Sequence, residues 1–198
     1  YAGGKTVQSS ALIYVLERLV AQDRELASGS LLTELKDIVV QRDELVEDRF
    51  HQLVERAMVL DLEQPLKMED FFTRISRVLG EQLGMDPSGL FHKFMARERE
   101  SSTVIAEGFA IPHIFVEKEN LLEVVLVRAR SGVIFPGDRV VHILFVFAGS
   151  SGERILHLKI LAAIAQVIQN PEFRRNWNAA RNDEELRYAV LLTERAGR

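Results

Sequence analysis

Hydrophobic residues recur at helical spacing through the first half of the chain. The spacing predicts amphipathic helices over residues 10–26, 31–39, 44–59, 68–83 and 87–99. Asp86 and Pro87 support the start of the last one, because Asp caps helix N-termini and Pro fits the first turn. The first three helices are too small to enclose a large core. We expect them to pack on a neighbouring domain, on each other across a dimer, or on further chain.

The pattern changes after residue 101. Short strands around Gly108 are followed by apolar runs over residues 121–129 and 140–147 that lack clean alternation. Such runs are typical of strands covered on both faces. Turns are predicted at residues 130–132 and 136–138, and helices at 153–169, 171–180 and 183–192. This order of elements predicts an α/β fold, with a small mixed β-sheet of about four or five strands sandwiched between helices.

Composition limits the classes of function. The 198 residues are 47% hydrophobic and 27% charged, which is typical of a globular protein. The net charge of −4, without a basic run, argues against nucleic acid as a partner. The chain has no Cys and no clustered metal ligands, so we expect no metal and no cofactor. No apolar run approaches the roughly 20 residues of a membrane-spanning helix, so we expect no membrane insertion of this part.

The familiar catalytic motifs, such as a Walker loop, GxSxG or HExxH, are missing. The reactive candidates are the five histidines, His51, His92, His113, His142 and His157. His113 follows Pro112 at the end of a predicted strand, and Pro restricts the backbone before it. This arrangement indicates a stiffly held imidazole beside a cleft. A surface histidine after a turn is the alternative, since Pro-His by itself does not define a catalytic site.

The run RERESSTVIAEGFAIPH, from Arg97 to His113, resembles the signature of type-2 enzyme IIA domains (fructose/mannitol/nitrogen-regulatory class) of the bacterial phosphotransferase system. In that family the active histidine is the one in the final PH pair. The resemblance continues through the apolar run 140–147 and a helix that carries His157-Leu158, and ends near Leu192. It implies an enzyme IIA type-2-like phosphocarrier domain at residues 60–198, preceded by a helical N-terminal extension or connector at residues 1–59.

The resemblance also implies a chemistry and its residues. His113 would accept a phosphoryl group from an HPr-like phosphocarrier and pass it to an enzyme IIB-like domain. His157 would orient or stabilise it, and Arg97 would contact the anion. The phosphate-loop candidates are Ser101, Ser102, Thr103 and Gly108. Each has a plainer alternative: His157 caps or packs its helix, Arg97 pairs with Glu100 or stays in solvent, and the hydroxyl residues shape the loop.

The chain departs from the family pattern at three positions. Ile114 follows the active histidine where most members carry Gly or another small residue, and Val104 and Ala106 stand where Gly is frequent. We expect the branched side chain of Ile114 to narrow the approach to the ring or to change the local backbone.

Two functions therefore compete. The first is a phosphohistidine carrier, a component of a phosphotransferase. The alternative is a non-transferring regulatory or sensory domain of a bacterial membrane transporter, which binds partners, including the transporter membrane domain, through the same surface. A structural dimerisation domain is a third reading, supported by the amphipathic N-terminal helices. The chain begins with Tyr1 rather than Met, so we expect it to be part of a longer protein. We expect it in the cytoplasm, free or as the cytosolic tail of an inner-membrane protein.

Overall fold

The computed structural model describes residues 44–195. The helices predicted over residues 10–26 and 31–39 lie outside the described residues. The chain forms two compact units. One spans residues 58–150, and the other combines the chain before residue 58 with the chain from residue 151 onward. The predicted boundary between residues 59 and 60 stays a prediction.

The unit of residues 58–150 is built on a seven-stranded mixed sheet. The strands are β1 (Met58–Leu62), β2 (Leu66–Lys67), β3 (Val104–Ala106), β4 (Gly108–Ala110), β5 (His113–Val116), β6 (Leu122–Phe135) and β7 (Arg139–Ser150). β6 and β7 form a long antiparallel hairpin. β1 and β2 follow one another along β6, while β4 and β5 follow one another along β7, all in parallel pairing. The predicted α/β class with a mixed sheet is confirmed, and the extra strands arise because both neighbours of the hairpin are interrupted.

Two local predictions change where strand pairing decides the structure, and a third holds. The predicted helix 44–59 ends early, as α3 (Glu44–Glu55), because Met58–Leu62 pairs with β6 as strand β1. The predicted turn at residues 130–132 is instead a shift of register inside β6. Gly132 permits it with a φ of 87°, and a Cβ there would lie 2.3 Å from Val140. The turn at residues 136–138 is confirmed and joins β6 to β7.

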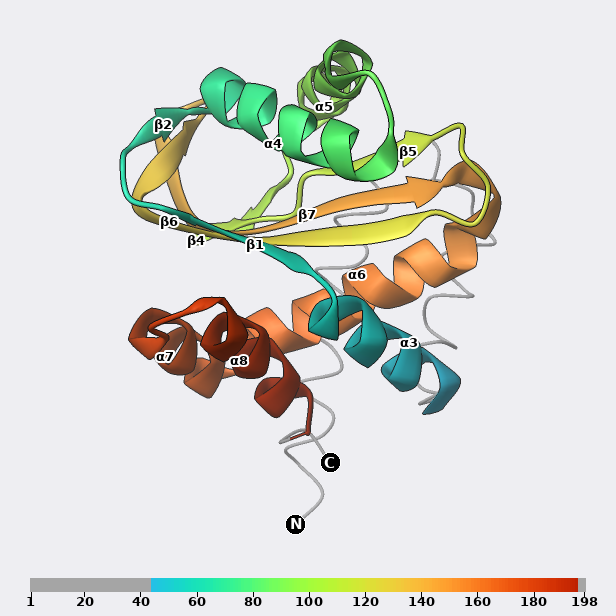
Figure 1. The fold of residues 1–198 in the computed structure, drawn as a ribbon. Coiled ribbons are helices and arrows are strands. Elements are labelled where there is room, and N and C mark those ends of the chain that lie inside the picture. Colours follow the sequence, from blue (N-terminus) through green and yellow to red (C-terminus); the bar gives the residue numbers. More distant parts are fainter. Residues whose placement is uncertain (1–43, 196–198) are drawn as a thin grey trace. The chain divides into compact units, whose positions relative to one another are not determined.

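Helices α4 (Met68–Leu83) and α5 (Pro87–Glu100) cover one face of this sheet (Figure 1). The bounds of α4 agree with the predicted helix. It ends at Gly84, whose φ of 64° is left-handed, as is usual for a C-terminal cap. The carboxylate of Asp86 accepts hydrogen bonds from the backbone N–H groups of Ser88 (3.3 Å) and Gly89 (2.9 Å), as the sequence predicted for the start of α5.

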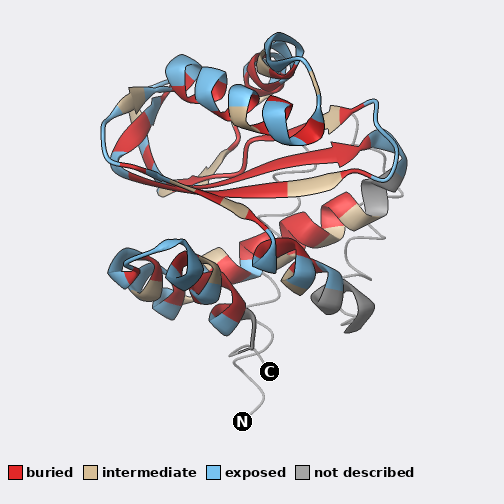
Figure 2. Cartoon of the chain, in the orientation of Figure 1, coloured by how far each residue is buried: buried red, intermediate tan, exposed pale blue. Residues whose placement is uncertain are grey.

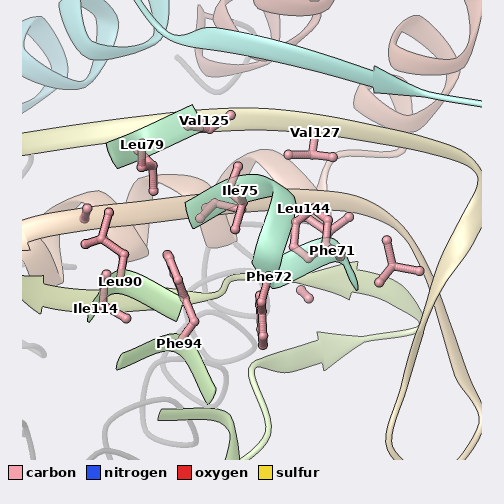
Figure 3. Close-up of a cluster of buried hydrophobic side chains, with 14 of the residues drawn as sticks. Phe71, Phe72, Ile75, Leu79, Leu90, Phe94, Ile114, Val125, Val127 and Leu144 are labelled. Carbon is pink, nitrogen blue, oxygen red and sulfur yellow. The ribbon is translucent and has the colours of Figure 1, made fainter. Parts of the chain in front are cut away.

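The core of this unit lies between the two helices and the sheet. Figure 3 shows side chains of α4 and α5 against those of β5, β6 and β7. Phe72 lies at its centre, with ring centroids 5.4 Å from Phe94 and 6.1 Å from Phe135. Along α4 the sheet-facing side is buried and the opposite side is exposed (Figure 2). The buried aromatic residues of α4 and α5 are therefore core packing, which holds α5 on the sheet.

The described part of the other unit, residues 44–57 and 151–195, is helical. It contains α3, a short 3-10 turn (Ser151–Glu153), α6 (Arg154–Gln169), α7 (Pro171–Ala179) and α8 (Asp183–Arg195). α3 packs on α6 and α8. Arg187 of α8 donates to the backbone carbonyl of Ala57 at 2.8 Å, and Trp177 packs on Phe173 with ring centroids 5.4 Å apart. Within residues 44–195, every helix is too short or too polar to cross a membrane.

Candidate functional site

His113 opens strand β5, whereas its place after Pro112 predicted the end of a strand. Pro112 explains the difference. It has no N–H to offer, so the strand beside β7 breaks after Ala110 and resumes at His113, which pairs with Phe147. The carbonyl of Pro112 still accepts a hydrogen bond from the N–H of Phe147 at 2.9 Å. The backbone on both sides of the imidazole is thus tied to a central strand.

The hydrogen bonds of the ring define its tautomer. Nδ1 of His113 lies 2.8 Å from the carbonyl oxygen of Ile111, and a carbonyl only accepts. Nδ1 therefore carries the proton. Nε2 accepts from Nε–H of Arg97 at 3.2 Å, so its lone pair points at the guanidinium. The result is a neutral imidazole whose nucleophilic nitrogen is Nε2. His113 as a whole residue is 1% exposed.

Arg97 reaches His113 from the last turn of α5. Its side chain is buried, and Nη1 donates to the carbonyl of Ser101 at 2.9 Å. This bond holds the guanidinium against the C-terminal end of the helix, where the orphan carbonyls and the helix dipole favour a cation. The structure therefore brings together Arg97 and His113, which are 16 residues apart in sequence, and it does not place Arg97 in solvent.

The segment from Ser101 to Thr103 lies beside this pair and is held by two side chains that the sequence analysis did not single out. Oε2 of Glu98 accepts from both the N–H (2.9 Å) and the hydroxyl (2.6 Å) of Thr103. Nη2 of Arg139 donates to the hydroxyl of Ser102 at 2.7 Å. Glu98 stands inside the motif from Arg97 to His113, so the sequence offered a reason to consider it as a site residue. Arg139 comes from β7, outside the motif, and nothing in the sequence around it indicated a place near the site.

Gly108, inside the motif, and Ile114, directly after it, each have a clear role in the local structure. Gly108 begins β4 with a φ of 77° and makes the tight reversal from β3, so its part in a phosphate loop stays a prediction. Ile114 is buried in the core beside Leu90 and Phe94 (Figure 3). Since successive side chains of a strand point to opposite faces, Ile114 points away from the side that carries the His113 ring. Its branched side chain therefore fills the core.

His157 lies in the first turns of α6 and is buried. It belongs to the helical unit, and its predicted partnership with His113 stays a prediction. Of the other histidines, His142 is exposed on β7 and lies 3.0 Å from the carbonyl of Ala129 through Nδ1. Among the described residues, no three His, Asp or Glu side chains gather in a way that would hold a metal ion.

A family model described as "Phosphoenolpyruvate-dependent sugar phosphotransferase system, EIIA 2" matches residues 52–192. The chain belongs to this family. The match spans the motif from Arg97 to His113 and continues through α6 and α7. The predicted resemblance to type-2 enzyme IIA domains is therefore confirmed, and with it a phosphocarrier or regulatory role.

Curated relatives of this EIIA domain include the nitrogen regulatory protein of Escherichia coli (strain K12), which is 31% identical over 123 residues. That alignment covers 61% of this chain and 76% of the relative. The multiphosphoryl transfer protein of Salmonella typhimurium is 29% identical over 136 residues, covering 67% of this chain and 35% of that protein.

Solved structures share the fold at lower identity. The nitrogen regulatory protein IIA-Ntr from Neisseria meningitidis superimposes with a TM-score of 0.62 at 24% identity, covering 70% of this chain and 94% of that one. IIA mannitol from Escherichia coli gives a TM-score of 0.55 at 17% identity, with 67% and 94% covered. These likenesses establish the fold of the EIIA domain.

Proposed function

We propose that this EIIA domain carries a phosphoryl group on Nε2 of His113. It receives the group from an HPr-like phosphocarrier and passes it to an enzyme IIB-like domain. The observation that supports this most directly is the hydrogen-bond geometry of the ring, from which the tautomer is assigned. The proton sits on Nδ1, and the unprotonated Nε2 faces a buried guanidinium. A neutral imidazole is a competent nucleophile near pH 7.

The proposed step balances as follows. The lone pair of Nε2 forms a bond to phosphorus, while the bond between phosphorus and the donor's own histidine nitrogen breaks. The electron pair of that bond returns to the donor ring. The Nδ1 proton of His113 stays in place, and its hydrogen bond to the carbonyl of Ile111 stabilises the positive charge that develops on the ring. Phosphoryl transfer needs little further covalent help, because positioning and electrostatics dominate.

Arg97 has two parts in this proposal. At rest its Nε–H occupies the Nε2 lone pair, so the guanidinium must turn away before Nε2 can attack. Once the phosphoryl group is bound, the same planar fork of donors can contact its oxygens. The bond from Nη1 to the carbonyl of Ser101 keeps the cation within reach throughout. Because the His113 ring is buried, transfer also requires the ring to become accessible to the donor.

The other predicted site residues enter the proposal in supporting roles. Ser101, Ser102 and Thr103 form the segment next to Arg97. Donors of Ser101 and Ser102 would contact the phosphoryl oxygens, while Thr103, whose N–H and hydroxyl are bonded to Glu98, would hold the segment in place. Gly108 would let the neighbouring backbone turn tightly. His157 would orient the phosphoryl group, a role carried over from the family resemblance.

A regulatory use of the same phosphorylation is the second candidate. It is favoured because the relative at 31% identity is named a nitrogen regulatory protein. In that case phosphorylation of His113 would change which partner is bound, and the partner would be a regulatory protein or the membrane domain of a transporter. Either role places the domain on the cytoplasmic side, free or attached to a membrane protein.

Phosphorylation by purified components tests the proposal. The chain is incubated with phosphoenolpyruvate, enzyme I and HPr, and its intact mass is measured. We expect the mass of one acid-labile phosphoryl group, absent in His113→Ala. His92→Ala is the matched control, because His92 is exposed on α5 with its Nδ1 on the carbonyl of Ser88, and it should be labelled like the wild type. A folded wild-type chain that gains no phosphoryl group would favour binding without transfer.

A further inference from the structure

The two consecutive residues Arg97 and Glu98 at the end of α5 hold opposite sides of the His113 ring. Arg97 contacts Nε2 directly. Glu98 reaches the other side through a chain of hydrogen bonds. Its carboxylate binds Thr103, the carbonyl of Thr103 accepts from the N–H of Ile111 at 2.9 Å, and the carbonyl of Ile111 accepts from Nδ1–H of His113.

We propose that Glu98 is a positioning residue which sets the tautomer of His113. This inference rests on the proposed function of His113 but concerns a residue that neither the sequence analysis nor the proposed transfer step uses. Glu98 makes no hydrogen bond with the ring and acts by holding Ile111, the residue whose carbonyl accepts from Nδ1–H.

Burial makes the hydrogen bonds between Glu98 and Thr103 hard to replace. Glu98 and Thr103 are 7% and 1% exposed, so water cannot readily replace their bonds. Within the described part of the chain, the second carboxylate oxygen of Glu98 has no hydrogen-bond partner, so Oε2 carries the polar contacts seen for this group. A buried carboxylate that accepts two donors from one residue fixes that residue tightly. The position of Thr103 then sets the position of the Ile111 carbonyl.

The remaining restraint on this segment comes from the sheet. The carbonyl of Pro112 is bonded to the N–H of Phe147, while Pro112 itself offers no donor. The segment Ile111–His113 is therefore held at two points, β7 on one side and Thr103 on the other. Without Glu98 the Thr103 point loosens, and the Ile111 carbonyl selects the Nδ1–H form less strongly, which leaves the bond from Arg97 to Nε2 to oppose the other tautomer alone. In free histidine the Nε2–H tautomer predominates, so the ring would drift toward a form whose Nε2 cannot attack.

The test reads the tautomer directly. Two-bond 1H–15N correlation spectra of the ¹⁵N-labelled chain, recorded where the ring is neutral, distinguish protonated from unprotonated ring nitrogens. We expect the Nδ1–H form for His113 in the wild type and a shift toward the Nε2–H form in Glu98→Ala. Glu100→Ala is the matched control, because Glu100 is exposed at the end of the same helix, and its spectrum should match the wild type. Melting curves followed by circular dichroism ensure that all spectra are taken well below unfolding.

Thr103→Val provides a second variant if Glu98→Ala does not fold. It removes the hydroxyl donor but keeps the shape and the N–H, so we expect a smaller shift in the same direction. In phosphorylation by HPr, we expect Glu98→Ala to react about 10- to 100-fold more slowly, since a misplacement of the reacting group by about 1 Å can cost about 100-fold.

The two proposals can fail separately. An unchanged His113 tautomer in both Glu98→Ala and Thr103→Val would overturn the positioning role, even if the wild type is phosphorylated. If the wild type accepts no phosphoryl group but the tautomer shifts as expected, the positioning role stands and the carrier function fails.

Discussion

Removing the guanidinium beside His113 is the most direct perturbation of the proposed site. Arg97 is 8% exposed and makes hydrogen bonds of 3.2 Å to Nε2 of His113 and 2.9 Å to the carbonyl of Ser101. Arg97→Ala deletes both and removes the guanidinium proposed to contact the transferring phosphoryl group. Arg97→Lys keeps the charge but cannot contact the ring and Ser101 in the same planar geometry.

The structure allows the size of the effect to be worked out. A hydrogen bond to a charged group contributes about 1.5–3 kcal/mol, and each 1.4 kcal/mol is a factor of about ten. Only the part of the interaction that strengthens in the transition state changes the rate. In Arg97→Ala no hydrogen bond to Nε2 has to break before attack, and this offsets part of the lost transition-state stabilisation. We therefore expect Arg97→Ala to slow transfer about 10- to 100-fold relative to the wild type. Arg97→Lys should have a rate between those of the wild type and Arg97→Ala.

The assay is the single-turnover transfer from phosphorylated HPr at saturating donor, followed by intact mass. Arg99→Ala is the matched control, since Arg99 is exposed in the same last turn of α5 and should transfer at the wild-type rate. Unfolding curves for each variant separate loss of the site from loss of the fold. If Arg97→Ala transfers as fast as Arg99→Ala, the guanidinium does not stabilise the transferring group and the reasoning is wrong.

Three predictions concern stability. The hydrogen bond from Arg128 lowers the pKa of Asp61 from 3.8 to about 2, so the carboxylate stabilises the fold above pH 4 and loses this effect as pH falls toward 2. Chemical unfolding gives the difference in unfolding free energy between the wild type and Asp61→Asn. We expect this difference to shrink by about 1–2 kcal/mol from pH 4 to pH 2, after allowance for the partial exposure of Asp61. A difference that does not change with pH would contradict the prediction. Phe72→Ala should lower the unfolding free energy of the sheet unit by about 3–5 kcal/mol in urea titrations, because its ring is fully buried. Gly132→Ala should cost at least about 2 kcal/mol by the same measurement, since its Cβ would meet Val140 at a positive φ; wild-type stability would show that the bulge relaxes freely.

Much of this protein followed from local sequence. The helix over Met68–Leu83 was predicted with its bounds, because a regular apolar repeat ends at a Gly that can adopt a left-handed φ. Asp86 and Pro87 marked the next helix through capping, which needs contacts only two or three residues away. The motif ending at His113 was enough to identify the family. Each of these features depends on residues that are near one another in the chain.

The tertiary structure decided what depends on distant partners. Met58–Leu62 became a strand because it pairs with residues 125–129, which helical periodicity cannot reveal. The ring of His113 depends on both kinds of contact. Its protonated nitrogen is set by a carbonyl two residues back, but its nucleophilic nitrogen faces an arginine brought from the end of α5 by the packing of that helix on the sheet. The sequence alone determined which histidine matters, and the tertiary contacts determined which of its nitrogens can react, because a tautomer is selected by the groups around the ring and not by the chain order.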